Sequence, residues 1–339
     1  MQTPNVLIID SVPENHFAEP DVERSVLAGC NIVHIQIAHI GDIRHELMRA
    51  ADAVIIWATF DTLYFDKAVL SEFTNCKGII KAAVGFDNID IEAARQLNIP
   101  VFNTPDYGTE EVADHTMAIL LSLSRKIAEL NEHVRAGGWD WAVSKPIKRL
   151  RGCNLGIVGF GRIGQAVARR AQPFGLNVGF YDPYLPSGVE KSQGVLRFES
   201  LDDLARVSDI VSVNSSLNAS SQNLINDATF QVMPDGVILI NTARGAIINS
   251  DDLLQGIRQN KVAYAGLDVL ESEPDIPDSF RSNPRVLLTP HSAFYSEESF
   301  LEMRTKSAQM ALSLLSNKPT RNLVNSSRPI HLYTSEERL

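Results

Sequence analysis

The chain has little cysteine. Only three cysteines, Cys30, Cys76 and Cys153, occur in 339 residues, and they are far apart, without the spacing of metal ligands. This excludes a disulfide-stapled secreted scaffold and gives no reason to expect a metal site. We therefore expect free thiols in a reducing compartment, and so a cytoplasmic location.

Positive charge and long hydrophobic runs are also scarce. Lys plus Arg number 31 against 41 for Asp plus Glu, which gives a net charge of −10. Because phosphate contacts need concentrated positive charge, a direct nucleic-acid partner is disfavoured. The longest apolar stretch, residues 117–123, is far shorter than the ~20 residues of a membrane span, and residues 1–5 hold no basic segment. We expect neither a membrane span nor a secretory signal.

Short apolar runs alternate with amphipathic stretches along the chain, which predicts parallel sheets covered by helices. In the first third the expected strands are Val6–Ile9, Val54–Ile56, Gly78–Lys81 and Val101–Phe102. In the second part six are expected, at Asn154–Val158, Val178–Tyr181, Asp209–Val213, Val237–Asn241, Ala263–Asp268 and Val286–Thr289. Six strands with helices between them are typical of a dinucleotide-binding fold.

The fold class is therefore α/β, with two doubly wound parallel-sheet domains. We expect a flavodoxin-like first domain over residues 1–106 and a Rossmann-type NAD-binding domain over residues 107–296. A last helix, Glu297–Leu315, is expected to return to the first domain, which residues 297–330 would complete. The first domain would then be discontinuous.

One long helix is expected between the two sheets, from about Glu110 to Ala136. Thr109 is the expected N-cap, and Gly137-Gly138 would end the helix. The segment Trp139–Leu150 is expected to be a loop.

This loop holds two tryptophans, Trp139 and Trp141, that lack another explanation. Aromatic residues are enriched at interfaces, so we expect a homodimer that uses part of this loop. The alternative is that they cover their own domain.

A glycine turn follows the strand Asn154–Val158 and opens a helix at Gln165–Gln172. In Gly159-Phe160-Gly161-Arg162-Ile163-Gly164, the three glycines allow a tight turn, a close approach to a pyrophosphate and close packing of helix on strand. Asp182 ends the next strand and fits a ribose hydroxyl acceptor. The alternative is a structural turn without a ligand.

Asp182 also bears on the choice of cofactor. A carboxylate accepts hydrogen bonds from ribose hydroxyls but repels a 2′-phosphate. The residues that follow it, 183–186, supply no Arg or Lys to neutralise that phosphate. NAD is therefore favoured over NADP.

Three charged residues follow three successive strands of the second domain: Arg244, Glu273 and His291. Ligands of open α/β sheets bind at the carboxyl ends of the strands, so these side chains are expected to converge. Histidine is a general acid near neutral pH, a neighbouring carboxylate holds one tautomer, and arginine binds a carboxylate through two hydrogen bonds. Each residue taken alone has an ordinary structural explanation, but the three together favour catalysis.

These residues carry a resemblance to the D-isomer-specific 2-hydroxyacid dehydrogenase family. The similar segments are Val84–Asp90, the glycine turn with Asp182, Asn241–Gly245, Asp268–Pro274 and Thr289–His291. Within the family, Tyr181–Leu185, Leu267–Pro274 and His291–Glu297 most resemble the C-terminal-binding-protein branch. Phe294 stands where that branch carries Trp.

The resemblance implies a role for each of these residues. Arg244 would anchor the substrate carboxylate, and His291 would be the acid–base residue with Glu273 as its partner. Val84 and Gly85 would bind substrate from the first domain. The implied cofactor-binding residues are Gly159, Phe160, Gly161, Arg162, Ile163, Gly164, Asp182, Ser215, Asn218, Thr242, Ala243, Asp268 and His291. It also implies a cleft between the domains and a dimer built on the cofactor domain.

Three functions remain open at this point. The first is an NAD-dependent enzyme that reduces a 2-oxo acid to a D-2-hydroxy acid. The second is an NAD(H)-sensing dimeric interaction protein that resembles the C-terminal-binding-protein corepressors. The third, a lyase or hydrolase with a retained NAD, is less favoured because no further catalytic lysine or cysteine motif is evident.

If the protein is the enzyme, Phe294 is expected to form an apolar wall of the substrate site, because it lies three residues after His291. The alternative is that it packs under the His291 loop.

Overall fold

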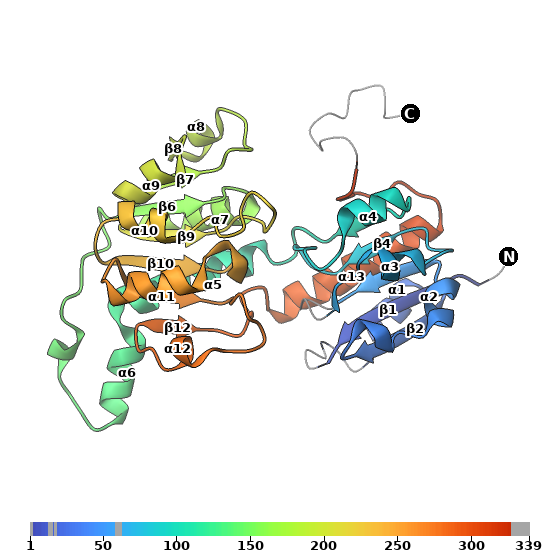
Figure 1. The fold of residues 1–339 in the computed structure, drawn as a ribbon, viewed down its shortest axis with the longest axis horizontal. Helices are drawn as coiled ribbons and strands as arrows, with labels where there is room; N and C mark the ends of the chain where they lie inside the picture. The colour runs from blue at the N-terminus through green and yellow to red at the C-terminus, as the bar shows by residue number, and fades with distance from the viewer. Residues whose placement is uncertain (1–2, 13–15, 17–18, 58–62, 327–339) are drawn as a thin grey trace. The chain divides into compact units, whose positions relative to one another are not determined.

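The computed structural model describes residues 3–12, 16, 19–57 and 63–326. The chain divides into two units: the first takes in the residues up to Tyr107 and those from Glu297 on, and the second is Gly108–Ser296. Residues 327–330, the end of the segment expected to complete the first domain, lie outside the described residues. Each unit is an α/β structure with one sheet (Figure 1).

The first unit has a five-stranded sheet in the order β2-β1-β3-β4-β5, in which every strand pair is parallel. This is the flavodoxin-like order. Its strands are β1 Asn5–Ser11, β2 Asn31–Ile37, β3 Ala53–Ile56, β4 Ile79–Lys81 and β5 Val101–Asn103. Its helices are α1 Asp21–Val26, α2 His45–Ala50, α3 Lys67–Ser71, α4 Ile91–Gln96 and α13 Glu297–Leu315, with a 3-10 turn at Ile40–Asp42.

Helix α13 belongs to the first unit although it comes last in the sequence. It packs with α1 and against β3 and β4. Its Arg304 is buried and forms two hydrogen bonds with the fully buried Glu23 of α1, Nε to Oε1 at 3.0 Å and Nη2 to Oε2 at 2.7 Å. A buried charge needs such a partner, so this pair fixes where α13 lies on the sheet.

The second unit has a seven-stranded parallel sheet in the order β12-β11-β10-β9-β6-β7-β8. Counted from β6, this is the 3-2-1-4-5-6 order of dinucleotide-binding folds with one more strand at the edge. Its strands are β6 Asn154–Val158, β7 Asn177–Tyr181, β8 Leu196–Phe198, β9 Ile210–Val213, β10 Val237–Asn241, β11 Val262–Leu267 and β12 Val286–Leu288.

Helices cover both faces of this sheet. One core joins α5 and α7 to the strands, and a second core on the other face joins α9, α10 and α11 to them. The helices are α5 Thr109–Arg125, α6 Ile127–Arg135, α7 Arg162–Ala171, α8 Val189–Gln193, α9 Leu201–Val207, α10 Asp227–Val232, α11 Ser250–Arg258 and α12 Asp278–Arg281. Short 3-10 turns lie at Trp141–Ser144, Gln172–Phe174 and Gly245–Ile247.

Four expectations about the elements were wrong in detail. The expected single long helix is two helices, because Lys126 takes a left-handed backbone with φ 51° and ends α5. Gly108, not Thr109, is the N-cap of α5. Strands β2 and β8 were not expected; both lie at sheet edges, where exposed polar residues break up the apolar run. Finally, α7 begins inside the glycine turn, at Arg162.

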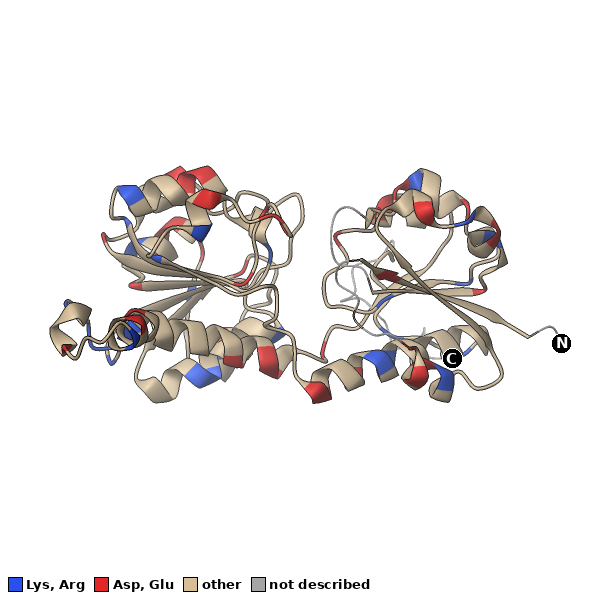
Figure 2. Cartoon of the chain, turned by 90° about the horizontal axis from the view of Figure 1, so that it is seen from below, with Lys and Arg blue, Asp and Glu red and all other residues tan. Residues whose placement is uncertain are grey.

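Charged residues lie mostly on the helices and loops of both units, whereas the strands are mostly uncharged (Figure 2). This is the distribution expected for sheets that are buried on both faces. Among the described helices, none is both long enough and apolar enough to cross a bilayer.

Candidate active site

The glycine turn joins β6 to α7, and its backbone packs too closely for side chains. Gly159 has φ 86°, and a Cβ there would lie 2.6 Å from the backbone N of Ser215. A Cβ on Gly164 would overlap the carbonyl oxygen of Gly159. A Cβ on Gly161, in contrast, would meet no atom within 4 Å. The turn is therefore closed on its own sheet and open on the side where a pyrophosphate would approach the start of α7.

The other residues of the turn divide between core and surface. Phe160 is buried and its ring stacks on Phe180, with centroids 4.0 Å apart. Arg162, the first residue of α7, is exposed, and Ile163 packs against the core. Phe160 thus holds the turn onto β7, while Arg162 stands at the open side.

Asp182 connects the turn to the loop that follows β7. Its Oδ2 accepts a hydrogen bond from the Phe160 amide at 2.9 Å, and its Oδ1 accepts one from the Tyr184 amide at 3.0 Å. Each carboxylate oxygen can accept a further bond. The carboxylate therefore fits the hydroxyls of a ribose as well as holding the turn.

Arg197 on β8 also lies beside this loop, and the sequence analysis missed it. Its Nη2 donates to the backbone oxygens of Asp182 at 3.1 Å and Leu185 at 2.8 Å, and its Nη1 donates to Pro186 at 3.1 Å. Residues 183–186 supply no Arg or Lys, as expected, but Arg197 brings a cation to the same loop from β8. Because β8 was not expected, no sequence signal placed Arg197 here.

Two polar side-chain atoms next to the glycine turn are buried without a hydrogen-bond partner: Oγ of Ser215 and Nδ2 of Asn214. Buried polar atoms are nearly always paired, so these two point to a polar ligand at this place. Asn218, expected on the adenosine side, is exposed, and its Oδ1 accepts from Ser220. Together with the open turn and Asp182, they fit a dinucleotide. Among the described residues, no group of three or more His, Cys, Asp and Glu side chains is placed to hold a metal ion.

The three expected catalytic residues follow the neighbouring strands β10, β11 and β12. Thr242 and Ala243 precede Arg244 in the segment after β10, and Thr242 Oγ1 lies 2.8 Å from Thr116 Oγ1 of α5 in the buried interior. Parallel strands have their carboxyl ends at one edge, so the three segments lie at one edge of the sheet.

His291 and Glu273 are in direct contact. Nδ1 of His291 lies 2.7 Å from Oε2 of Glu273, and both side chains are about three-quarters buried, with exposed fractions of 26% and 20%. A carboxylate at Nδ1 leaves Nε2 for proton transfer. His291 also has a left-handed backbone with φ 51°, which is uncommon outside glycine and is found at sites where surrounding contacts hold it.

Arg244 lies on a loop that is packed tightly against the Glu273 loop. Its Nη1 donates to the Ala243 carbonyl at 2.7 Å. The next residue, Gly245, approaches the backbone of Leu270 and Glu271 so closely that a Cβ would overlap it. The segments that carry Arg244 and Glu273 are therefore packed backbone against backbone.

Asp268 holds the loop of His291. It is buried, and its two carboxylate oxygens accept from the Ser292 and Ala293 amides, each at 3.0 Å. Its backbone oxygen accepts from the His291 amide at 2.8 Å. Asp268 thus positions the acid–base loop, a role that the sequence pattern did not indicate.

The expected substrate residues are divided between the units. Val84 and Gly85 lie in the first unit after β4, where the Val84 carbonyl accepts from Asn103 Nδ2 at 2.7 Å. Arg244 and Phe294 lie in the second unit. The Phe294 ring is edge-on to Tyr295, with centroids 6.4 Å apart, and its backbone lies over Gly108. The substrate roles of all four residues stay predictions.

Comparisons with known proteins place the chain in a family. Residues 117–293 match the family model described as D-isomer specific 2-hydroxyacid dehydrogenase, NAD binding domain. A glyoxylate reductase from Aeropyrum pernix is 36% identical over 284 residues, which cover 82% of this chain and 84% of that protein.

Two solved structures are similar over nearly the whole chain. A glyoxylate/hydroxypyruvate reductase from Sinorhizobium meliloti, in complex with NADP and malonate, has a TM-score of 0.83 at 26% identity and covers 95% of this chain and 97% of that one. A D-lactate dehydrogenase from Aquifex aeolicus, complexed with NAD and lactic acid, has a TM-score of 0.82 at 26% identity, covering 92% and 96%. The glycine turn, the His291–Glu273 pair and the family match over residues 117–293 lead to one conclusion. The chain belongs to the D-isomer-specific 2-hydroxyacid dehydrogenase family.

Proposed function

We propose that this protein reduces a 2-oxo acid to a D-2-hydroxy acid with a nicotinamide dinucleotide, in a reversible reaction. The observation that carries the proposal is the 2.7 Å contact between His291 and Glu273 at the carboxyl edge of a dinucleotide-binding sheet. A protein that only senses a dinucleotide needs no such acid–base pair. Membership of the family supports the same activity.

The side chains divide the work as follows. The bound cofactor supplies the reducing equivalent. Nε2 of His291 delivers the proton to the carbonyl oxygen of the substrate, and Glu273 holds the ring through its contact with Nδ1. Arg244 binds the substrate carboxylate and polarises the neighbouring carbonyl. In the oxidative direction His291 takes the proton back.

The test is oxidation of NADH with a panel of 2-oxo acids. We expect turnover with at least one of them, and a loss of about 10²- to 10⁴-fold in His291→Gln, the size of a general-acid contribution. Binding of NADH, followed by fluorescence, should survive in the variant. No turnover above that of His291→Gln with any 2-oxo acid would contradict the proposal.

NAD is the preferred cofactor in this proposal. The Asp182 carboxylate would accept from the ribose hydroxyls, and Arg197, a cation beside the same loop, already donates to three backbone oxygens. The similar structures include one with NADP and one with NAD, so the preference rests on Asp182 rather than on the family.

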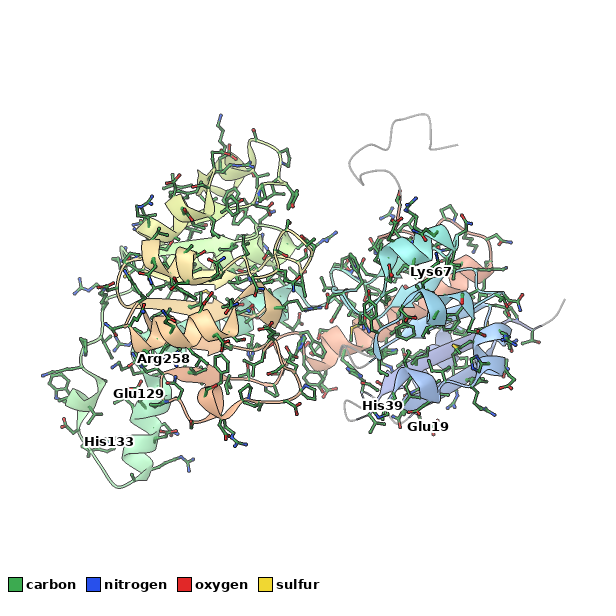
Figure 3. The ribbon with its side chains drawn as sticks, in the orientation of Figure 1. Glu19, His39, Lys67, Glu129, His133 and Arg258 are labelled. Atoms are coloured by element: carbon green, nitrogen blue, oxygen red, sulfur yellow. The ribbon has the colours of Figure 1, made fainter. Side chains whose placement is uncertain are left out.

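A homodimer is proposed for the assembly. Helix α6, which carries the labelled Glu129 and His133, projects from the body of the second unit together with the turn that follows it (Figure 3). Trp139 is 90% exposed and Trp141 is 72% exposed, although Lys145 lies 4.4 Å over the Trp141 ring. So much exposed aromatic surface fits burial against a second copy. A monomer by light scattering at micromolar concentration would contradict it.

The finer features of the proposal follow from the residues. We assign cofactor binding to residues 107–296 and substrate binding to residues 1–106 with 297–330, where Val84 and Gly85 would contribute. The three cysteines are free thiols, which supports a reducing compartment such as the cytoplasm.

The kinship with the C-terminal-binding-protein branch rests on three short segments alone. The similar proteins named above are enzymes, so the corepressor-like alternative is not favoured.

A further inference from the structure

His115, on α5, reaches the carboxyl ends of β11 and β12. Its Nε2 lies 3.0 Å from Oγ1 of Thr289 and 3.6 Å from Oδ1 of Asp268, and its side chain is 25% exposed. Sequence analysis gave this residue no role. It is a titratable side chain beside the catalytic loop that the proposed chemistry does not use.

The direction of the hydrogen bonds follows from the proton count. The Thr289 hydroxyl has one proton and donates it to Oδ1 of Asp268 at 2.6 Å. Its oxygen can then only accept from His115, so Nε2 of His115 carries a proton. The donation therefore runs from His115 to Thr289 and from Thr289 to Asp268.

Asp268 connects these hydrogen bonds to the loop that carries His291. Its carboxylate and its backbone oxygen accept the amides of three consecutive residues, 291–293. This loop contains the left-handed backbone of His291, which needs such support. If the carboxylate rotates, the amides of residues 292 and 293 lose their acceptors.

We infer that His115 is a positioning residue for the acid–base loop, acting on His291 through Thr289 and Asp268. The inference rests on the proposed function for its catalytic consequence, but the chain of hydrogen bonds does not. By donating to Thr289, His115 fixes the hydroxyl toward Asp268, and Asp268 then holds its carboxylate in the plane that the loop amides need.

A simpler explanation is that His115 merely helps α5 pack on the sheet. The helix is already held there by apolar contacts, because Ile119 and Leu123 of α5 pack directly on Gly266 of β11, where a Cβ would overlap Ile119. Thr116 adds its buried contact with Thr242. Loss of the imidazole should therefore leave α5 in place.

The test compares His115→Leu, His115→Gln, Thr289→Val and the double variant His115→Leu/Thr289→Val. We expect His115→Leu to lower kcat by about tenfold, the value of roughly one hydrogen bond to a charged network, with KM and the thermal midpoint little changed. His115→Gln should keep most of the activity because its amide can still donate to Thr289. The double variant should lose no more than Thr289→Val, since both changes break one chain.

A second readout does not depend on turnover. Amide hydrogen exchange of residues 291–293 should be faster in His115→Leu than in the unmodified protein and slow again in His115→Gln. His45→Leu, which removes an exposed histidine of the first unit, is the control and should change neither exchange nor kcat.

The outcomes separate the two proposals. Unchanged exchange and unchanged kcat in His115→Leu would overturn the inference, as would equal losses in the Leu and Gln variants. If no 2-oxo acid is turned over, the proposed function fails, and the exchange of residues 291–293 alone decides whether His115 orders the loop.

Discussion

Glu273 holds His291 with one carboxylate oxygen and its own loop with the other. Oε2 lies 2.7 Å from Nδ1 of His291, while Oε1 accepts the Leu270 amide at 2.9 Å. The group that orients the imidazole is thus itself fixed at both oxygens. Since the Leu270 backbone in turn lies against Gly245, the orientation of His291 depends on the Arg244 loop as well.

Glu273→Gln should lower the turnover of 2-oxo acids by about 10- to 100-fold, because a hydrogen bond to a charged group is worth roughly 1.5–3 kcal/mol. The Gln amide can still contact Nδ1 of His291 but carries no negative charge, so this variant isolates the contribution of the carboxylate. The measurement is kcat, and an unchanged value would show that the carboxylate does not act on His291.

Asp182→Ala should relax the preference for NAD over NADP and should cost NAD affinity by about 1–3 kcal/mol. Asp182→Asn is the matched variant: it keeps an acceptor for the Phe160 or Tyr184 amide but removes the charge that repels a 2′-phosphate. If charge is the cause, both variants accept NADPH better. Equal kcat/KM for NADH and NADPH in the unmodified protein would contradict the assignment.

Gly245→Ala should reduce both stability and turnover, because its Cβ would overlap the backbone of Leu270 and Glu271. Overpacking of this kind costs about 1–3 kcal/mol. Gly41→Ala is the control, since a Cβ there meets nothing within 4 Å. Thermal melting and kcat test both effects; a variant as active and stable as Gly41→Ala would show that the two loops adjust independently.

Phe294→Ala should raise KM for branched 2-oxo acids far more than for glyoxylate, which has no side chain to contact the ring. The expected order of substrates is apolar 2-oxo acids first and acidic or phosphorylated ones second. Steady-state kinetics across the panel decides this. Equal changes for all substrates, or 2-oxoglutarate as the best substrate, would mean that the ring packs under the His291 loop instead.

His34→Gln should flatten the loss of stability between pH 7 and 5. Burial lowers the pKa of His34 below 6.5, and this outweighs the negative charges of Asp10, Glu23 and Glu19, which raise it. Because the pKa is lowered in the folded state, the unfolded chain binds more protons than the folded protein below about pH 6.5. The free energy of unfolding therefore decreases as the pH is lowered. Thermal midpoints across this range measure the effect, with exposed His39→Gln as the control. An equal slope in His34→Gln and in the unmodified protein would exclude His34 as the cause.

The sequence predicted the fold class because buried parallel strands are continuous apolar runs. Strand β1 was found on that basis. Helix α13 was found from its helical pattern, with the same bounds as in the structure. Edge strands such as β8 have no such run: Leu196 is 64% exposed and Arg197 stands in its middle. The break at Lys126 was also missed, since neither glycine nor proline marks it.

The residues of the site likewise divide into those with a sequence signal and those without one. The glycine turn and Asp182 follow from a motif whose spacing has a physical cause, and Arg244, Glu273 and His291 follow from their places after strands. His115 and Arg197 carry no motif. Their hydrogen-bond partners are 174 residues away for His115 and 11–15 residues away, across a turn and an unrecognised strand, for Arg197. Only the three-dimensional structure brings them to the site.

The pairing of Arg304 with Glu23 has a consequence for the time course of synthesis. The two residues are 281 positions apart, and α13 supplies part of the cover of β3 and β4. The second unit is continuous in sequence, so all of its strands are synthesised before α13. The first unit, although it is translated first, cannot close its core until then. Glu23 must wait for its buried partner, and the half of the protein that begins synthesis is the last to finish folding.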